Sequence, residues 1–275
     1  MKKILSVFAL LFACILTLAS CGGNKENTIV VGTMAQPGQP IIESIREALK
    51  KEGYDLEVKL FSDFNTPNQA LAEGSIDANL FQHEPFLNTY NTSNNTDLYC
   101  AAKLYDCVYG GYTKKGITSL NQIPEGKTIT IANDSSNMIR CLKILAASGV
   151  ITLIDELPAT VNATDIDSYI ASNPKNLVIK PISTNMIAAS LNDEDTYLGL
   201  VNATFAIAAG LTKDQLLCQE ADPEHVNANI LACRTEDKDS AKIAALVKVL
   251  TSDDTAKFID DTFKGTIIPY FVSLV

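Results

Sequence analysis

Side chains that could bind an anion or carry a proton are few in this chain of 275 residues. The three arginines and two histidines are Arg46, Arg140, Arg234, His83 and His225. Arg140 follows the polar segment 133–137 in the predicted first turn of a helix, where free backbone N–H groups and the helix dipole would assist its guanidinium in binding a carboxylate. Arg46 and Arg234 have acidic neighbours, as solvated surface pairs do. Arg140 is therefore the candidate anion-binding residue, with a surface arginine as the alternative.

Aromatic and amide side chains gather near the predicted carboxyl ends of strands, where open α/β sheets bind their ligands. The aromatic set, with its neighbouring histidine, is Phe61, Phe64, Phe81, His83 and Phe86. The polar set is Asn133, Asp134, Ser136, Arg140, Asn202 and Asn229. Asn202 and Asn229 end or interrupt apolar strands, so each amide either satisfies loop backbone or accepts a hydrogen bond from a ligand ammonium group.

Several kinds of chemistry are disfavoured by the motifs that the sequence lacks. It has no His-Glu-x-x-His spacing, and two isolated histidines are too few for a His-rich metal site. Gly-x-Ser-x-Gly, Walker and Gly-x-Gly-x-x-Gly motifs are also missing, so we predict no catalytic residue, metal or cofactor. The 22 Lys and Arg against 32 Asp and Glu give a net charge of −10, which argues against nucleic acid as a partner.

Short β-branched runs alternate with helical patterns, which predicts an α/β fold with mainly parallel sheets covered on both faces. In the first part of the chain, strands are predicted at 28–33, 56–61 and 77–81, and helices at 40–53 and 65–73. The same order restarts with a strand at 128–132, a helix at 138–147 and strands at 177–182 and 196–201. A strand at 228–233 and helices within 239–263 complete the pattern.

The restart of this pattern predicts two α/β lobes. Because the last helices have no sheet to cover in the second lobe, the chain is expected to return to the first. We therefore predict that lobe 1 contains residues 28–111 and 221–275, and that lobe 2 contains residues 112–220. Two crossings would join the lobes, so the ligand cleft between them could close by hinge motion.

The N-terminus has the pattern of a secretory signal, with Lys2 and Lys3 before an apolar run over residues 4–18. The following tetrad, residues 18–21, reads Leu-Ala-Ser-Cys and resembles the bacterial lipobox. We predict a signal peptide at 1–20, a lipidated tether at 21–27, and acyl chains such as palmitate on Cys21 that anchor the chain to a bacterial membrane, outside the cytoplasm. Ordinary secretion, with a cysteine there by chance, is the alternative.

Five cysteines remain after the predicted cleavage and acylation, and an odd number cannot all pair within one chain. They are Cys100, Cys107, Cys141, Cys218 and Cys233. Cys100 and Cys107 could meet across a turn, but small buried hydrophobic residues are the favoured interpretation.

Motifs across nearly the whole mature chain resemble the methionine-binding lipoprotein family, the NlpA-type substrate-binding proteins of ABC importers. The matching stretches, in the family's order, are residues 67–74, 76–83, 85–87, Asn133-Asp134 with Asn137 and Arg140, 173–177, Val201-Asn202 with Phe205-Ala206, 209–211, Asn229 with Arg234, and 263–265. The resemblance implies a type II periplasmic-binding-protein fold that delivers L-methionine, or a closely related apolar amino acid, to an ABC permease and its ATPase. It further implies that Arg140 holds the ligand carboxylate and that Asn202 and Asn229 hold the amino-acid head group. The implied side-chain pocket is walled by Phe64, Phe81, His83 and Phe86.

The sequence departs from the family pattern at several of these positions. Ala132, Ser135, Ser136 and Ile139 stand where the family usually has Pro, Pro, Thr and Gly, and Ala188-Ala189 where a Pro-Arg pair is expected. Phe64, Phe86 and Phe205 replace the more common Tyr, which makes the predicted pocket less polar. Two other functions stay open from the sequence: a surface adhesin or interaction lipoprotein, and a lyase-type enzyme on the same fold with His83 as its acid–base group.

Overall fold

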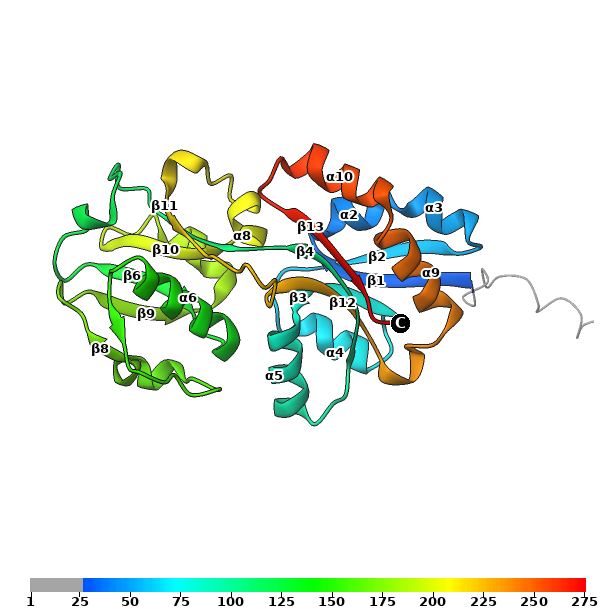
Figure 1. The fold of residues 1–275 in the computed structure, drawn as a ribbon, viewed down its shortest axis with the longest axis horizontal. Coiled ribbons are helices and arrows are strands. Elements are labelled where there is room, and N and C mark those ends of the chain that lie inside the picture. Colours follow the sequence, from blue (N-terminus) through cyan, green and yellow to red (C-terminus); the bar gives the residue numbers. More distant parts are fainter. Residues whose placement is uncertain (1–26) are drawn as a thin grey trace, which may run out of the picture.

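The computed structural model describes residues 27–275, which form two α/β lobes along the long axis of the molecule (Figure 1). We call the part of the chain around the six-stranded sheet lobe 1 and the part around the five-stranded sheet lobe 2. This arrangement agrees with the predicted α/β class. The predicted signal peptide, residues 1–20, and Cys21 lie outside the described residues.

The sheet of lobe 1 has the strand order β13-β4-β12-β3-β1-β2. Its strands are β1 (Thr28–Met34), β2 (Asp55–Phe61), β3 (Ala78–His83), β4 (Tyr99–Asp106), β12 (Ala228–Cys233) and β13 (Ile268–Ser273). β1 is parallel to β2 and β3, but β12 is antiparallel to both β3 and β4. The prediction of a mainly parallel sheet is therefore wrong. The chain leaves lobe 1 through β4 and returns through β12, and these neighbouring strands must run in opposite directions.

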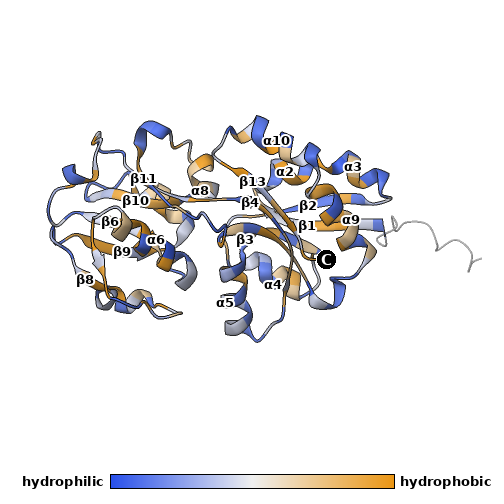
Figure 2. Ribbon diagram, in the orientation of Figure 1, coloured by the Kyte–Doolittle hydropathy of each residue, from blue (hydrophilic) through white to orange (hydrophobic). Residues whose placement is uncertain are grey.

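Helices cover both faces of this sheet. Those of lobe 1 are α2 (Gly38–Ser44), α3 (Arg46–Lys51), α4 (Thr66–Ala72), α5 (Glu84–Asn94), α9 (Ala241–Leu250) and α10 (Asp253–Phe263). Along β12 the buried side chains alternate: Leu231 packs in the core beneath α2, α3, α9 and α10, whereas Ile230 packs in a second core with residues of α4 and α5. Burial on both faces explains why β12 is apolar along almost its whole length, whereas the edge strand β2 carries charged residues on its exposed side (Figure 2).

The sheet of lobe 2 has the strand order β11-β5-β10-β6-β9. Its strands are β5 (Tyr109–Tyr112), β6 (Thr128–Ala132), β9 (Val178–Ile182), β10 (Thr196–Asn202) and β11 (Leu216–Gln219), beside a small ribbon of β7 (Thr152–Leu153) and β8 (Ile170–Ser172). β6 is parallel to β9 and β10, and β5 is antiparallel to β10 and β11. Since β5 pairs only within this sheet, the chain changes sheet between Asp106 and Tyr109, slightly before the predicted boundary at residue 112.

The helices of lobe 2 are α6 (Ser135–Ala147), α7 (Ile187–Ser190) and α8 (Ala203–Ala208). Short 3-10 helices complete the fold: η2 (Leu120–Gln122), η3 (Ala163–Tyr169), η4 (Thr184–Met186), η5 (Lys213–Gln215) and η6 (Thr235–Asp237). Residues of α6 such as Leu142 pack with strand residues such as Ile129 and Ile131 in a core separate from those of lobe 1. The connections β4–β5 and β11–β12 are the two crossings between the sheets.

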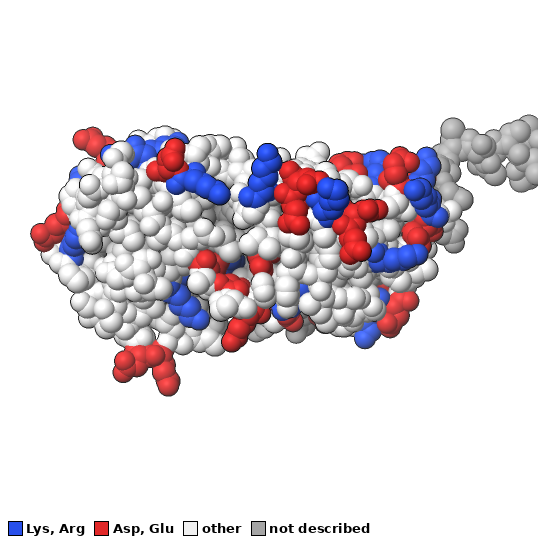
Figure 3. Space-filling view, turned by 45° about the horizontal axis from the view of Figure 1, so that its top comes forward, with Lys and Arg blue, Asp and Glu red and all other residues white. Residues whose placement is uncertain are grey.

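The surface of the described residues is mixed in charge. On the face drawn in Figure 3, acidic and basic side chains alternate over the helices of lobe 1, and much of lobe 2 is uncharged. Within residues 27–275, no helix is both long enough and apolar enough to span a bilayer. The five cysteines in this part of the chain are unpaired, and all but Cys218 are buried, in agreement with the favoured interpretation.

Candidate functional site

Six of the seven predicted ligand-binding residues line one small cavity where the lobes meet: Phe64, Phe81, His83, Phe86, Asn202 and Asn229. Gln82 and Asn137, which were not predicted as site residues, complete the lining. The cavity has a volume of about 10 Å³, which is room for roughly one water molecule. The lobes are therefore closed on each other, and an amino acid fits only after they separate or the lining side chains move.

The elements of the fold explain why these residues converge. Phe81 and His83 lie at the carboxyl end of β3, and Phe86 lies in the first turn of α5, which follows directly. Asn229 lies on β12 opposite His83 in the antiparallel register. Asn202 ends β10 and approaches from lobe 2. The pocket thus lies beyond the carboxyl ends of strands from both sheets.

Four phenylalanine rings close the apolar side of the pocket. The ring centroid of Phe64 lies 5.7 Å from that of Phe81 and 6.1 Å from that of Phe86. It also lies 5.1 Å from the ring of Phe205, which comes from α8 of lobe 2. These are ordinary distances for packed aromatic pairs. Phe64 therefore contacts rings of both lobes across the junction.

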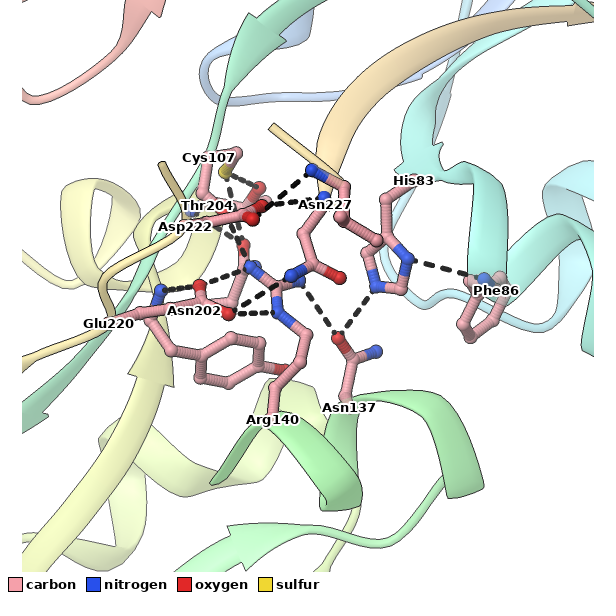
Figure 4. Close-up of polar contacts among 12 residues, drawn as sticks. His83, Phe86, Cys107, Asn137, Arg140, Asn202, Thr204, Glu220, Asp222 and Asn227 are labelled. Atoms are coloured by element: carbon pink, nitrogen blue, oxygen red, sulfur yellow. Dashed lines mark hydrogen bonds and ion pairs between the residues drawn. The ribbon is translucent and has the colours of Figure 1, made fainter. Parts of the chain in front are cut away.

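His83 forms a hydrogen bond between the lobes. Its Nε2 lies 3.0 Å from Oδ1 of Asn137 in α6, and its Nδ1 accepts from the backbone N–H of Phe86 at 3.2 Å (Figure 4). An amide oxygen can only accept, so Nε2 carries the proton and the ring is neutral. Burial, and secondarily the charge of Arg140, lower the pKa of His83 from 6.5 to about 3. A ring that stays neutral near pH 7 is a poor acid–base group, which counts against a lyase-type enzyme.

Arg140 differs from its prediction in two ways. First, α6 begins at Ser135 rather than at Met138, so Arg140 lies in the second turn instead of the first. The carboxylate of Asp134 caps the helix by accepting from the backbone N–H of Asn137 at 3.0 Å. The chain therefore supplies its own carboxylate at the helix start, where the sequence predicted a site for the ligand.

Second, Arg140 does not line the small cavity, and its guanidinium is already paired. Its Nε and Nη2 donate to the two carboxylate oxygens of Glu220 at 2.8 and 2.5 Å (Figure 4). Nη2 also donates to the carbonyl of Cys107 at 3.1 Å, and Nη1 donates to Oδ1 of Asn137 at 3.2 Å. Burial lowers the pKa of Arg140, but the hydrogen bonds and charge of Glu220 outweigh that effect and raise the pKa above its ordinary value.

The two predicted amides line the pocket, and each has one group without a partner among the described residues. Oδ1 of Asn202 accepts from the backbone N–H of Thr204 at 3.0 Å and so caps α8, which is the loop-backbone role. Its Nδ2 has no partner among the described residues. Nδ2 of Asn229 donates to the hydroxyl of Tyr105 at 3.1 Å, and its Oδ1 has no partner in this part of the chain. The pocket therefore presents one amide donor and one amide acceptor.

The other arginines lie away from the pocket. Arg46 pairs with Glu43 at 2.6 Å on the surface, as predicted. Arg234 pairs with Asp237 at 2.5 Å but is largely buried, because it also donates to the carbonyls of Leu71 and Ile76. Arg234 therefore stabilises lobe 1 through partly buried hydrogen bonds, and the prediction of a solvated surface pair is wrong for this residue.

A larger groove, of about 700 Å³, lies on the other side of Arg140 between α5, α6 and the second crossing. Hydroxyl, amide and aliphatic side chains line it, with Arg140, Lys143, Glu220 and Asp222 as charged members and no aromatic ring. We take the small cavity as the candidate site, because the aromatic and amide groups that fit an apolar amino acid converge there. Among the described residues, no cluster of His, Cys, Asp and Glu could hold a metal ion.

Two α/β lobes joined by two crossings, with an enclosed apolar and amide-lined pocket at their junction, define the class of two-lobed substrate-binding proteins. The chain belongs to the NlpA lipoprotein family, whose sequence model matches residues 29–271. This membership confirms the resemblance found in the sequence.

Known relatives support this assignment over the length of the chain. The methionine-binding lipoprotein MetQ of Bacillus subtilis is 35% identical, over 98% of this chain and 99% of its own. The D-methionine-binding lipoprotein MetQ of Salmonella typhi is 33% identical, over 91% and 92%. The structure of a nutrient-binding protein from Burkholderia cenocepacia bound to methionine has a TM-score of 0.81 at 34% identity and covers 88% of this chain and 100% of that one. The predicted fold class, and the prediction that the chain is not an enzyme, agree with these relatives.

Proposed function

We propose that this protein binds L-methionine, or a closely related apolar amino acid, between its two lobes. The observation that carries the proposal is the convergence of an aromatic wall with one free amide donor and one free amide acceptor in a single closed pocket. The relatives named for methionine, and the methionine-bound structure among them, support this choice of ligand.

Each end of the ligand would have its own partners in the pocket. Oδ1 of Asn229 would accept from the ammonium group, and Nδ2 of Asn202 would donate to the carboxylate. Arg140 does not line the closed cavity, but four of its five N–H groups are bound and one on Nη1 is left over, which would donate to the carboxylate once the ligand enlarges the cavity. The thioether would pack against Phe64, Phe81 and Phe86, because polarisable sulfur contacts aromatic rings favourably.

Capture requires the lobes to open and close. The cavity of about 10 Å³ is far smaller than pockets that hold drug-sized ligands, which are on the order of 300–1,000 Å³. Opening would break the hydrogen bond between His83 and Asn137 and separate Phe64 from Phe205. Lobe 1, residues 28–106 with 228–275, would move against lobe 2, residues 109–219, with the two crossings as the hinge.

The finer proposal is that the protein is anchored in the cell envelope by acyl chains on Cys21 and delivers its ligand to an ABC permease and its ATPase. The lipobox-like tetrad and the lipoprotein names of the relatives support it.

Two experiments test the anchor and the delivery separately. In bacteria labelled with a fatty acid, Cys21→Ser should abolish label and leave uncleaved precursor. In cells dependent on external methionine, deletion of the protein should abolish methionine uptake at low concentration, and the full chain should restore it.

The ligand itself is tested by competition against labelled L-methionine. Norleucine should compete within about a hundredfold of methionine, because an apolar pocket distinguishes one methylene by about 1–3 kcal/mol. Glutamate and lysine should fail, since the pocket offers no partner for a charged side-chain tip. D-methionine belongs in the series because some relatives are named for it. A series in which glutamate or a dipeptide wins would overturn the proposed ligand but not the fold.

A further inference from the structure

Glu220 is a buried carboxylate that the sequence did not single out. Its side chain is 7% exposed and that of its partner Arg140 is 4% exposed, so the pair is almost fully removed from water. Two further donors bind the same carboxylate: the backbone N–H of Tyr109 at 3.1 Å and Nδ2 of Asn227 at 3.3 Å. Each carboxylate oxygen of Glu220 thus has two partners, which compensate the burial of the charge.

This pair connects three parts of the fold. Arg140 lies on α6 of lobe 2, Glu220 lies in the second crossing, and the carbonyl of Cys107 that Arg140 also binds lies in the first crossing. The guanidinium therefore holds both crossings against α6. Its Nη1 edge faces Asn137, which lines the pocket and binds His83 (Figure 4).

The charge balance of the site follows from this arrangement. A guanidinium and a carboxylate in a two-point contact cancel each other, and the groups that line the cavity are phenylalanines, amides and a neutral imidazole. A ligand with a net charge would meet no opposite net charge here. A zwitterion, with one group of each sign, fits a site of balanced charge better than a cation or an anion.

We infer that Glu220 is a positioning residue for ligand recognition: it fixes Arg140 by its Nε and Nη2 atoms, leaves a single Nη1 N–H for the ligand carboxylate, and so sets the selectivity for zwitterionic amino acids. This inference rests on the proposed function. Glu220→Gln removes the balancing charge while keeping the size of the side chain, so Arg140 then acts on the ligand as an uncompensated cation. Carboxylate-bearing ligands gain from that change, and cationic ligands lose.

The test compares two probes, L-methionine and methioninamide, which lacks the carboxylate and is a cation. In Glu220→Gln, the ratio of the Kd of methioninamide to the Kd of methionine should rise by at least about tenfold over wild type. Glu220→Asp, which keeps the charge, and Asp222→Asn, which removes a charge from the same crossing, should leave the ratio within about threefold. A ratio that stays constant in Glu220→Gln while both affinities fall would overturn the inference, because loss of structure weakens both probes alike.

A measurement on the wild-type protein covers the case in which Glu220→Gln does not fold. With three arginines in the chain, the Nε–H signals in a ¹⁵N spectrum can be assigned by substitution of Arg46 and Arg234. The signal of Arg140 should stay protected from exchange with and without methionine, because Glu220 holds Nε in both states. Exchange that becomes at least about tenfold faster on adding methionine would overturn the inference. Wild-type protein that binds no methionine would instead refute the proposed function.

Discussion

The pH dependence of folding stability should reveal the environment of His83. Folding takes its imidazole out of water, and burial and the Arg140 charge lower its pKa from 6.5 to about 3. Below about pH 6.5 the unfolded chain binds a proton at this residue that the folded chain refuses. The unfolded state then binds more protons, so this contribution to the free energy of unfolding falls as pH falls from about 6.5 to about 3.

The magnitude depends mainly on the unfolded chain. At about pH 4.5 the folded protein does not bind a proton at His83, because its pKa of about 3 lies more than one unit below the pH. The unfolded chain does bind it, because its pKa of 6.5 lies about two units above the pH, and each unit corresponds to about 1.36 kcal/mol. His83 should therefore cost the protein about 2.7 kcal/mol of stability at about pH 4.5 that it does not cost at about pH 7.5. A folded-state pKa one unit higher would change this figure little.

Urea denaturation of wild type and of a His83 variant at the two pH values measures this contribution of His83 to the free energy of unfolding. Wild type should lose about 2.7 kcal/mol more between about pH 7.5 and 4.5 than His83→Gln, which cannot take up the proton. His225→Gln is the matched control. It keeps His83 and should therefore still show the loss of stability that His83 causes at about pH 4.5. Since the chain has only two histidines, the imidazole signals can also be followed by NMR. Equal losses in wild type and His83→Gln, or a His83 signal that titrates above about pH 5, would refute the reasoning.

Three further outcomes are expected. Arg140→Ala leaves Glu220 buried without its partner and should lower the free energy of unfolding by about 3–5 kcal/mol in urea, whereas Arg46→Ala, in an exposed pair, should change it by less than about 1 kcal/mol; a loss that small for Arg140→Ala would contradict the buried pair. X-ray scattering should give a smaller radius of gyration with methionine than without, and identical curves with a bound ligand would contradict hinge closure. Methionine sulfoxide should bind at least about tenfold more weakly than methionine, because the phenylalanine rings offer its oxygen no donor; equal affinities would mean that another donor reaches the thioether position.

Some elements of the fold could be predicted from the local sequence, because local preference and burial in the fold favour the same structure there. β6 and β12 occupy the predicted ranges, 128–132 and 228–233, since short apolar runs with polar ends suit strands that are buried on both faces. The predicted single helix over 40–53 is instead two, α2 and α3, which meet at Ile45. Its apolar periodicity continues through that break, so the pattern of residues gives no sign of it.

The strand β5, which follows the first crossing, was not predicted from the sequence. β5 contains Gly110 and Gly111, which lower strand propensity. Their role depends on a distant segment, since a Cβ on Gly110 or Gly111 would overlap the side chains of Leu216 and Cys218 on β11. No local pattern reports this contact between segments about a hundred residues apart.

In the candidate site, too, residues whose position follows from local sequence were predicted, and a residue that depends on a distant partner was not. The aromatic and amide residues were found because they lie at the carboxyl ends of strands, a position that sequence order reveals. Glu220 was missed, because nothing in the polar segment around it indicates a partner 80 residues earlier. The prediction that Arg140 binds the ligand carboxylate therefore took no account of Glu220, whose carboxylate already pairs with Arg140 in the fold.

Calorimetric titration with L-methionine tests the central claim most directly. The full chain is unfolded and refolded first, to remove any ligand carried from the cell, and is then compared with Asn229→Ala and with the exposed control Asn192→Ala. We predict that one methionine binds per chain, that Asn229→Ala weakens binding at least about tenfold by removing the acceptor for the ammonium group, and that Asn192→Ala leaves the affinity unchanged. An absence of binding heat with wild type, or an unchanged affinity in Asn229→Ala, would contradict the account.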